Sequence, residues 1–377
     1  MLEKKIPPSP ISIIELVEKI EKEKDIHVIR LDVAEPMFAP PWSAVKGTVD
    51  AVLKGKYKYS PSAGIFELRK AISEYLMKTR GLKYSEDEIL ITVGGKFASF
   101  SFFLGLLKPR DSVVLIKPYW SSFKAIPLML NIKVIEVWSK YPYHLDEEKL
   151  KKVMSKKPKA IVINSPNNPT GGILDENDLK LLKDLAEDYN FYVLSDEIDW
   201  AYVYNGKIFK SPASLLRDRT IIVDGFSKVF SMSGWRVGFA AGPKELIKNL
   251  KIVQEHTVSS PTTFAQYGCL SVLEKYEEYL SIIIKECERK RKIAVEELNK
   301  SEKIECPLPE GGFYVYPKIK GYKSTLEFAK MLLEQKAVSV IPGDFFGDYR
   351  GHFRISYALS DEELIEGIKR ILDFIKK

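Results

Sequence analysis

One lysine stands at the centre of a stretch of small and apolar residues, Asp224-Gly-Phe-Ser-Lys-Val-Phe-Ser-Met-Ser-Gly-Trp-Arg-Val-Gly238. This lysine, Lys228, follows the apolar, β-branched run at 220–223, which predicts a buried strand. Most lysines are solvated at the surface, but an amine partly removed from water can form a Schiff base with a carbonyl compound. Arg236 follows a turn of small residues and would bring a fixed cation close to that amine. These surroundings favour a chemical role for Lys228.

Further polar and aromatic groups follow other predicted strands, and together they suit a phosphorylated aromatic aldehyde. Asp196 ends a strand-like run and could pair with a pyridinium nitrogen, which an ionised carboxylate keeps protonated. Asn168, in Ser165-Pro-Asn-Asn-Pro-Thr-Gly-Gly172, is an amide donor suited to a ring oxygen. Trp120 could stack on the face of the ring.

The stretch Thr92-Val-Gly-Gly-Lys-Phe-Ala98 predicts a phosphate site, because it ends a strand and opens a helix. The backbone N–H groups of Gly94, Gly95 and Lys96, with the helix dipole, would form a cradle for an anion. Arg236 would add a bidentate contact to the same phosphate.

Each of these residues has a structural alternative when taken alone. Asp196 could cap a helix or a turn, and Asn168 could belong to a proline turn. The glycine pair could form an ordinary strand–helix turn, and Trp120 could lie in the core. The order and spacing of the whole set favour a site.

Predicted strands and helices alternate through the middle of the chain. We expect strands at 89–93, 113–116, 133–137, 160–164, 191–195, 220–224 and 237–241. Helical patterns lie between most of them, and the clearest runs to Tyr189 with Asp175 as its N-cap and Asp178 at its third position. The pattern predicts an α/β domain with a mostly parallel, seven-stranded sheet between helices. Asp196 and Lys228 would project from the carboxyl edge of that sheet, where open α/β sheets bind ligands.

The rest of the chain predicts a smaller α+β domain. It contains a helix at 9–24, a helical region at 261–299 that leads out of the larger domain, and strands at 312–316, 338–341 and 352–357. Helices are expected after Ser324 and Ser360, each with the pattern of a capping box. We therefore divide the chain into a large cofactor-binding domain, 40–282, and a small discontinuous domain, 1–39 with 283–377.

Composition argues against several other classes of protein. The net charge is +7, but lysines alternate with glutamates as on solvated helix faces, so no nucleic-acid partner is expected. The three cysteines form neither a disulfide framework nor a metal pair, and the four histidines lack zinc-type spacing. We expect no metal and a cytoplasmic protein. No run approaches the roughly 18 apolar residues of a membrane span.

The motifs together resemble the class I, fold-type I pyridoxal-5′-phosphate-dependent aminotransferases over nearly the whole chain. The matching stretches are Tyr59-Ser-Pro-Ser-Ala-Gly-Ile-Phe-Glu-Leu-Arg69, Thr92-Val-Gly-Gly-Lys96, 164–171, Ser195-Asp-Glu-Ile198, Ser227-Lys228 with Gly234-Trp-Arg236, Pro342-Gly343 and Phe353-Arg-Ile-Ser-Tyr-Ala358. The resemblance implies fold type I and pyridoxal 5′-phosphate as the cofactor. It also implies transfer of an amino group from an L-amino acid to a 2-oxo acid.

The resemblance further implies roles for single residues. Lys228 would form the Schiff base and shuttle a proton, and Arg354 would hold the substrate α-carboxylate. The segment around Ala34 would cover the substrate, and Tyr59 would reach the phosphate of a neighbouring subunit. A homodimer with shared active sites is therefore expected. The substrate would also contact Lys96, Trp120 and Asn168.

Three positions depart from the usual pattern of the family. Ala34 stands where glycine is typical, Gly225 where a serine often binds the phosphate, and Asp199 where a tyrosine usually donates to the ring oxygen. We expect Asp199 to be an ionised carboxylate that stays solvated in an open cleft and disfavours the deprotonated ring oxygen. One alternative is a neutral Asp199 that donates a proton as the tyrosine does. The other is an Asp199 that turns away and leaves its place to Tyr202 or Tyr204.

The leading interpretation is an aminotransferase, which the Gly-Trp-Arg and Arg354 segments favour. Lys96, at the mouth of the site, predicts a preference for aspartate or glutamate, and the alternative is a lysine that only faces solvent. Two other functions stay open at this point. One is a C–S β-lyase on the same fold, and the other is a non-catalytic regulatory protein that retains the cofactor.

Overall fold

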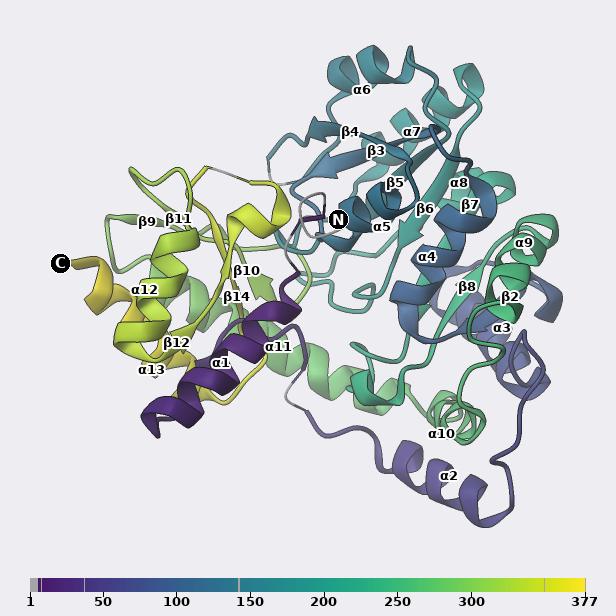
Figure 1. The fold of residues 1–377 in the computed structure, drawn as a ribbon, viewed down its shortest axis with the longest axis horizontal. Coiled ribbons are helices and arrows are strands. Elements are labelled where there is room, and N and C mark those ends of the chain that lie inside the picture. Colours follow the sequence, from purple (N-terminus) through teal and green to yellow (C-terminus); the bar gives the residue numbers. More distant parts are fainter. Residues whose placement is uncertain (1–5, 8, 37, 142, 349, 377) are drawn as a thin grey trace.

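A seven-stranded sheet forms the centre of the larger part of the molecule (Figure 1). The computed structural model describes residues 6–376 apart from 8, 37, 142 and 349, and apart from the side chain of Ile11. The strands are β2 (Ile89–Thr92), β3 (Ser112–Lys117), β4 (Lys133–Trp138), β5 (Ala160–Asn164), β6 (Tyr192–Asp196), β7 (Thr220–Gly225) and β8 (Gly238–Ala241). Their order is β2-β8-β7-β6-β5-β3-β4. Strand β8 runs opposite to the other six strands, so its pairs with β2 and β7 are antiparallel and the remaining pairs are parallel. The predicted α/β class and the seven predicted strands are confirmed.

The strands form because their apolar residues are buried on both faces of the sheet. In β3, Val113 and Leu115 pack into one core cluster, whereas Val114 and Ile116 pack into another. This alternation follows from the period of two in a strand. Helices therefore cover both faces, as continuous apolar strands require.

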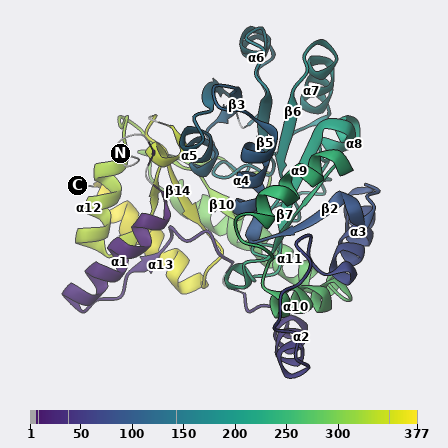
Figure 2. The same ribbon diagram turned by 45° about the vertical axis from the view of Figure 1, so that its right-hand side comes forward.

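The helices of the larger part are α2 (Trp42–Leu53), α3 (Phe66–Arg80), α4 (Gly94–Leu106), α5 (Ser122–Met129), α6 (Glu147–Met154), α7 (Glu176–Asp188), α8 (Ala213–Leu216), α9 (Lys244–Glu255) and α10 (Thr263–Leu273). Helix α10 packs against α2 and α3. Helix α2 stands at the lower edge of the molecule, away from the smaller part (Figure 2).

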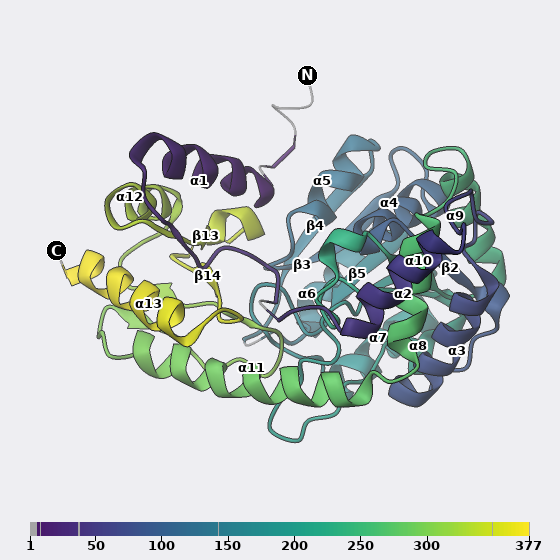
Figure 3. The same cartoon turned by 90° about the horizontal axis from the view of Figure 1, so that it is seen from below.

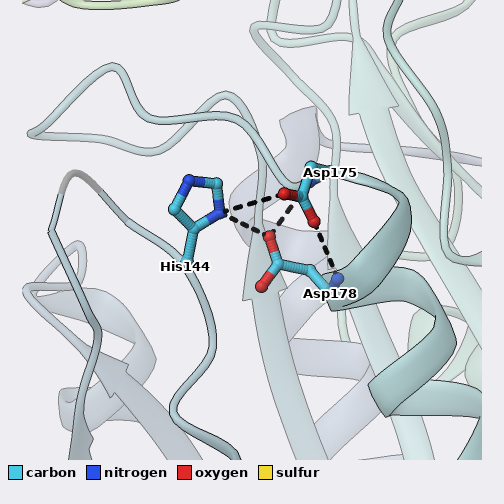
Figure 4. A group of neighbouring side chains, drawn as sticks. All are labelled: His144, Asp175 and Asp178. Carbon is cyan, nitrogen blue, oxygen red and sulfur yellow. Dashed lines mark hydrogen bonds and ion pairs between the residues drawn. The ribbon is translucent and has the colours of Figure 1, made fainter.

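Helix α7 begins with Asp175 as its N-cap, as predicted, and Asp178 completes a capping box (Figure 4). The amide of Asp178 donates to Oδ1 of Asp175 at 2.9 Å, and the amide of Asp175 donates to Oδ2 of Asp178 at 3.0 Å. His144 adds Nδ1 at 2.7 Å from Oδ2 of Asp178. Each of these three residues offers one atom that could bind a metal ion, and these atoms lie within 4.8 Å of one another. Since the helix cap already uses them, we interpret the group as structural.

The smaller part combines helices with short strands. Its helices are α1 (Ile11–Lys24), α11 (Glu277–Leu298), α12 (Leu326–Lys336) and α13 (Asp361–Lys376). Strands β10 (Tyr314–Val315), β14 (Phe353–Ser356) and β13 (Ile341–Pro342) form an antiparallel sheet. Two strand pairs complete it: β1 (Ile29–Arg30) with β12 (Val338–Ser339), and β9 (Ile304–Glu305) with β11 (Lys318–Ile319).

Helix α11 runs along the lower edge of the view in Figure 3 and joins the larger part to the smaller one. The predicted boundary between residues 282 and 283 falls inside this helix. The division into 40–282 and 1–39 with 283–377 stays a prediction. Among the helices that the structure describes, we find none with the length and apolar character needed to cross a membrane.

Two local predictions differ from the structure. The helical region at 261–299 is two helices, α10 and α11, separated at residues 274–276. The capping box predicted at Ser324 is wrong, because the N-cap of α12 is Thr325 and no capping box forms there. The Ser324 hydroxyl donates to Oδ1 of Asp344 at 2.7 Å and accepts from the amide of Leu326 at 3.3 Å. At Ser360 the cap forms, and its hydroxyl oxygen accepts from the amide of Glu363 at 3.2 Å.

Candidate active site

A cavity of about 590 Å³ opens at the carboxyl edge of the large sheet. The predicted residues that line it are Ala34, Gly95, Lys96, Trp120, Asn168, Asp196, Asp199, Lys228, Arg236 and Arg354. Gly94 directly precedes this wall at the start of α4. Tyr59 lies outside the cavity and is 90% exposed.

The register of three parallel strands brings these residues together. Asn164 at the end of β5 pairs with Asp196 at the end of β6, and Asp196 pairs with Val223 in β7. The strands therefore end at one level, and the segments that follow them carry Asn168, Asp199 and Lys228 into the same cavity. This is the edge at which open α/β sheets bind ligands.

Lys228 presents a half-buried amine to the cavity. Its Nζ donates a hydrogen bond to the carbonyl oxygen of Ala34. Burial lowers the pKa of Lys228, while the carboxylates of Asp199 and Glu35 oppose this shift. A lowered pKa increases the share of neutral amine, the form that attacks a carbonyl carbon.

Asp196 is a buried carboxyl group whose strongest charged neighbours are other carboxyl groups. It is 7% exposed, and its Oδ1 accepts from the amide of Ile198 at 3.1 Å. Burial raises the pKa of Asp196 to about 8, and the nearby Asp199, Asp224 and Glu197 add to the rise. A protonated ring nitrogen would stabilise the ionised form of Asp196. The residue therefore fits the pyridine nitrogen of pyridoxal phosphate.

The start of α4 forms an anion site. Its N-cap, Val93, offers no side-chain hydrogen bond, so the first N–H groups of the helix are open to a ligand. Gly94 has φ +71°, and a Cβ there would lie 2.7 Å from Nη2 of Arg236. The backbone of Arg236 has a left-handed conformation, with φ +55°. Its Nη1 donates to the carbonyl oxygen of Ser233 at 2.7 Å. Glycine thus lets a guanidinium approach the helix terminus, and the pair fits a phosphate.

Close packing of β7 against β8 explains the departure at Gly225. Gly225 pairs with Gly238 across these strands. A Cβ at Gly225 would lie 2.8 Å from the Cα of Gly238 and 3.1 Å from the carbonyl oxygen of Val237. The serine that often binds the phosphate at this position does not fit here.

Arg354 is a buried cation, 2% exposed, on the side of the cavity formed by β14. Nη1 donates to Oδ1 of Asn168 at 2.9 Å, and Nη2 donates to the carbonyl oxygen of Asp32 at 2.7 Å. Both acceptors are neutral, and Nε has no partner among the described residues. Burial lowers the pKa of Arg354. Arg354 is therefore suited to bind an anionic carboxylate. Because Oδ1 of Asn168 already accepts from Arg354, the NH₂ group of Asn168 is left to donate to a ligand.

Lys96 and Trp120 lie together on the cavity wall. Nζ of Lys96 is 5.0 Å from the centroid of the Trp120 ring. Burial lowers the pKa of Lys96, and the positive charge of Arg236 lowers it further. Trp120 is half-buried and packs edge-to-face on Phe123 at 5.3 Å, so it borders both the core and the cavity.

The expectation that Asp199 stays solvated is wrong. This side chain is 1% exposed, and burial raises its pKa to about 7 against the opposing charges of Lys228 and Arg354. The alternative that Tyr202 or Tyr204 takes its place is also wrong. Tyr202 donates to the carbonyl of Lys228 at 2.9 Å, and Tyr204 donates to the carbonyl of Gly312 at 2.6 Å.

Sequence reasoning missed several residues of the cavity wall. Asp32 and Glu35 flank the predicted Ala34, and their proximity to it was the available signal. Tyr314 also lines the cavity, with its ring 4.6 Å from the guanidinium carbon of Arg354. In the sequence it resembles any buried aromatic residue of a short strand.

A desolvated amine, an anion site at a helix terminus and a buried carboxyl group meet at the carboxyl edge of an open α/β sheet. Together they define the class of fold-type I pyridoxal-phosphate enzymes. The model of the family "Aminotransferase class I and II" matches residues 26–371, and the chain belongs to this family.

Relatives and solved structures agree with this membership. A probable aspartate/prephenate aminotransferase of Aquifex aeolicus (strain VF5) is 37% identical over 382 residues, covering 97% of this chain and 95% of the relative. The Thermus thermophilus aspartate aminotransferase solved with maleate has a TM-score of 0.93 at 33% identity, with 98% and 97% of the two chains covered. The aromatic aminotransferase of Pyrococcus horikoshii OT3 has a TM-score of 0.88 at 32% identity, with 96% and 98% covered.

The protein is therefore a pyridoxal-phosphate-dependent aminotransferase, which moves an amino group from an amino acid to a 2-oxo acid. The β-lyase and the non-catalytic binding protein are not favoured, because the similarity to aminotransferases extends over nearly the whole chain.

Proposed function

We propose that this aminotransferase prefers amino donors with an acidic side chain, aspartate or glutamate. The proposal rests on a comparison of the contacts of two cations on the cavity wall, Arg30 and Lys96. Asp32 neutralises Arg30 through two hydrogen bonds of 2.8 and 2.9 Å. Lys96 instead contacts the ring face of Trp120, so its charge is available to a substrate carboxylate. The Aquifex and Thermus relatives, whose names include aspartate, support the same preference.

The α-carboxylate of the substrate would bind Arg354. A guanidinium matches a carboxylate with two parallel hydrogen bonds. Lys96 would meet the distal carboxylate. Ala34 and Trp120 would border the substrate, and Trp120 would also stack on the cofactor ring.

Pyridoxal 5′-phosphate, when bound, withdraws the electron pair that remains when a proton leaves the substrate Cα. The chain supplies the other functions. Nζ of Lys228 would take the Cα proton and return it, while Asp196 would keep the ring nitrogen protonated. Asn168 would donate its amide to the ring oxygen. The backbone N–H groups of Gly94, Gly95 and Lys96 would hold the phosphate together with the side chain of Arg236.

A panel of donors and acceptors tests the preference. Native enzyme should use aspartate and glutamate better than alanine or phenylalanine. Lys96→Ala should lower kcat/KM for aspartate by about 10-fold or more, as for loss of a charge-assisted hydrogen bond, and should change alanine far less. Lys117→Ala is the matched control, because Lys117 also covers a tryptophan, Trp138 at 4.6 Å, but does not line the cavity.

An equal loss on aspartate and alanine in Lys96→Ala would refute the preference. A native enzyme that favours phenylalanine would support an aromatic donor instead. The Pyrococcus relative is named for such a reaction, and the aromatic rings of Trp120 and Tyr314 make it the second candidate.

We also infer a homodimer with shared active sites. Helix α2 exposes apolar side chains, with Trp42 at 75%, Val49 at 50% and Leu53 at 79%. Exposed apolar groups that lie together mark interaction surfaces. Tyr59, on the segment after α2, is exposed and does not line the described cavity of its own chain, and it would reach the phosphate site of a second copy.

The dimer predicts that one substitution affects both assembly and cofactor binding. Leu53→Lys should give a monomer in analytical ultracentrifugation and weaken cofactor retention, whereas Ile208→Lys, at an equal exposure of 79%, should not. A Leu53→Lys protein that stays dimeric would contradict the assigned surface.

We further propose a cytoplasmic location, since the three cysteines are buried and free.

A further inference from the structure

Asp199 carries an unused polar atom in the wall of the cavity. Asp199 comes three residues after Asp196, in a turn of the backbone. A hydrogen bond from the amide of Ile198 to Oδ1 of Asp196 stabilises this turn. The side chain of Asp199 is 1% exposed and lines the cavity beside Lys228 and Arg354. Its Oδ1 is buried and has no hydrogen-bond partner among the described residues. A buried carboxyl oxygen without a partner is costly, so this atom points to a ligand.

Groups from several elements determine the charge of Asp199. The cations that face it are Lys228, after β7, and Arg354, in β14. The acidic groups that interact with it are Asp196, Asp224, Tyr202, Tyr314 and Tyr357. With the cofactor bound, the amine of Lys228 would be joined to it, and a bound substrate carboxylate would pair with Arg354. Each interaction would reduce the stabilisation that these cations give to a carboxylate at Asp199.

The cofactor adds a further reason for a neutral side chain. Its ring oxygen is negatively charged when deprotonated, and two adjacent anions repel each other. A carboxyl group in this place therefore takes a proton, and its O–H can donate where a carboxylate can only accept. Burial already raises the pKa of Asp199 to about 7 before any ligand is present.

We propose that Asp199 is held as a neutral carboxylic acid whose O–H donates a hydrogen bond to the ring oxygen of pyridoxal phosphate, replacing the tyrosine that is usual at this position. The inference rests on the site proposed above. Tyr314 is the competing donor, because its hydroxyl is also buried without a partner among the described residues and it lines the same cavity. Tyr202 is already committed to the carbonyl of Lys228.

An absorbance titration against pH separates the two charge states of Asp199. The enzyme is loaded with pyridoxal phosphate, and the pKa of the bound chromophore is measured in native protein, Asp199→Ala, Asp199→Asn and Tyr314→Phe. A neutral donor that stabilises the deprotonated ring oxygen lowers the chromophore pKa. Asp199→Ala should therefore raise that pKa by about 1 or more. Asp199→Asn, whose amide also donates, should stay close to native, and so should Tyr314→Phe.

An ionised Asp199 gives the opposite sign. Removing a negative charge beside the ring oxygen would lower the chromophore pKa in both Asp199→Ala and Asp199→Asn, and this result would overturn the proposal. A rise in Tyr314→Phe with no change in Asp199→Ala would assign the donor to Tyr314 and would also overturn it.

Infrared difference spectra give a second readout that does not depend on catalysis or on the alanine variant folding. The loaded native protein should show the C=O stretch of a protonated carboxyl group that Asp199→Asn lacks at neutral pH. Identical spectra in that region would contradict the proposal.

Borohydride reduction distinguishes a failure of the proposed site from a failure of this inference alone. If Lys228 acquires no cofactor, the proposed site is wrong and this inference with it. If Lys228 is labelled but the titration has the wrong sign, only the inference fails.

Discussion

Replacing Arg354 with lysine tests whether binding of the substrate carboxylate depends on the geometry of the guanidinium or only on its positive charge. The guanidinium is 2% exposed and is oriented by Asn168 at 2.9 Å and by the carbonyl of Asp32 at 2.7 Å. A lysine keeps the charge but cannot form two parallel hydrogen bonds to a carboxylate. One charge-assisted hydrogen bond contributes about 1.5–3 kcal/mol. The apparent KM should therefore rise by about 10-fold to about 150-fold for both the amino acid and the oxo acid.

Single-turnover half-reactions measure the two substrates separately, because each changes the absorbance of the bound cofactor. Arg350→Lys is the matched control, since its guanidinium covers Trp138 at 3.7 Å, pairs with Asp348 at 2.9 Å and does not line the cavity. It should leave both constants unchanged. If Arg354→Lys retains full cofactor and both constants stay at their native values, Arg354 does not hold the carboxylate.

Two further substitutions test the walls of the cofactor site. Gly225→Ser should lower the melting temperature without tightening cofactor binding, because its Cβ would lie 2.8 Å from the Cα of Gly238. A variant that binds the cofactor more tightly at native stability would contradict this packing. Asp196→Asn should raise the melting temperature of the apoprotein more at about pH 9 than at about pH 5. Burial raises the folded pKa of Asp196 to about 8, so the stability from this group is present below its ordinary value of 3.8 and is lost as pH rises through about 8. An equal change at both pH values would refute the burial argument.

The large sheet could be predicted because its signal is local. Buried parallel strands are continuous runs of apolar, β-branched residues, and β5 is buried at every position. The site followed from the same signal, since Asn168, Asp196 and Lys228 each come at or shortly after the end of a strand. Their convergence in one cavity is a consequence of strand register.

The features that could not be predicted depend on contacts between distant segments. Asp199 is buried, and it lines one cavity with Tyr314 and Arg354, which the smaller part of the chain contributes. Gly225 is required by the approach of Gly238 from the next strand. The hydroxyl of Ser324 is held by Asp344, and the N-cap of α12 is Thr325 instead. In each case the partner comes from another segment, and its position is set by the tertiary fold.

The most direct test of the central claim is to identify the lysine that binds the cofactor. The loaded native protein should absorb in the visible or near-visible range and lose this band on borohydride reduction. Peptide mass spectrometry should then place the reduced cofactor on Lys228, and Lys228→Ala should acquire none. An adduct on Lys96 or any other lysine would contradict the assignment of the site and the roles derived from it.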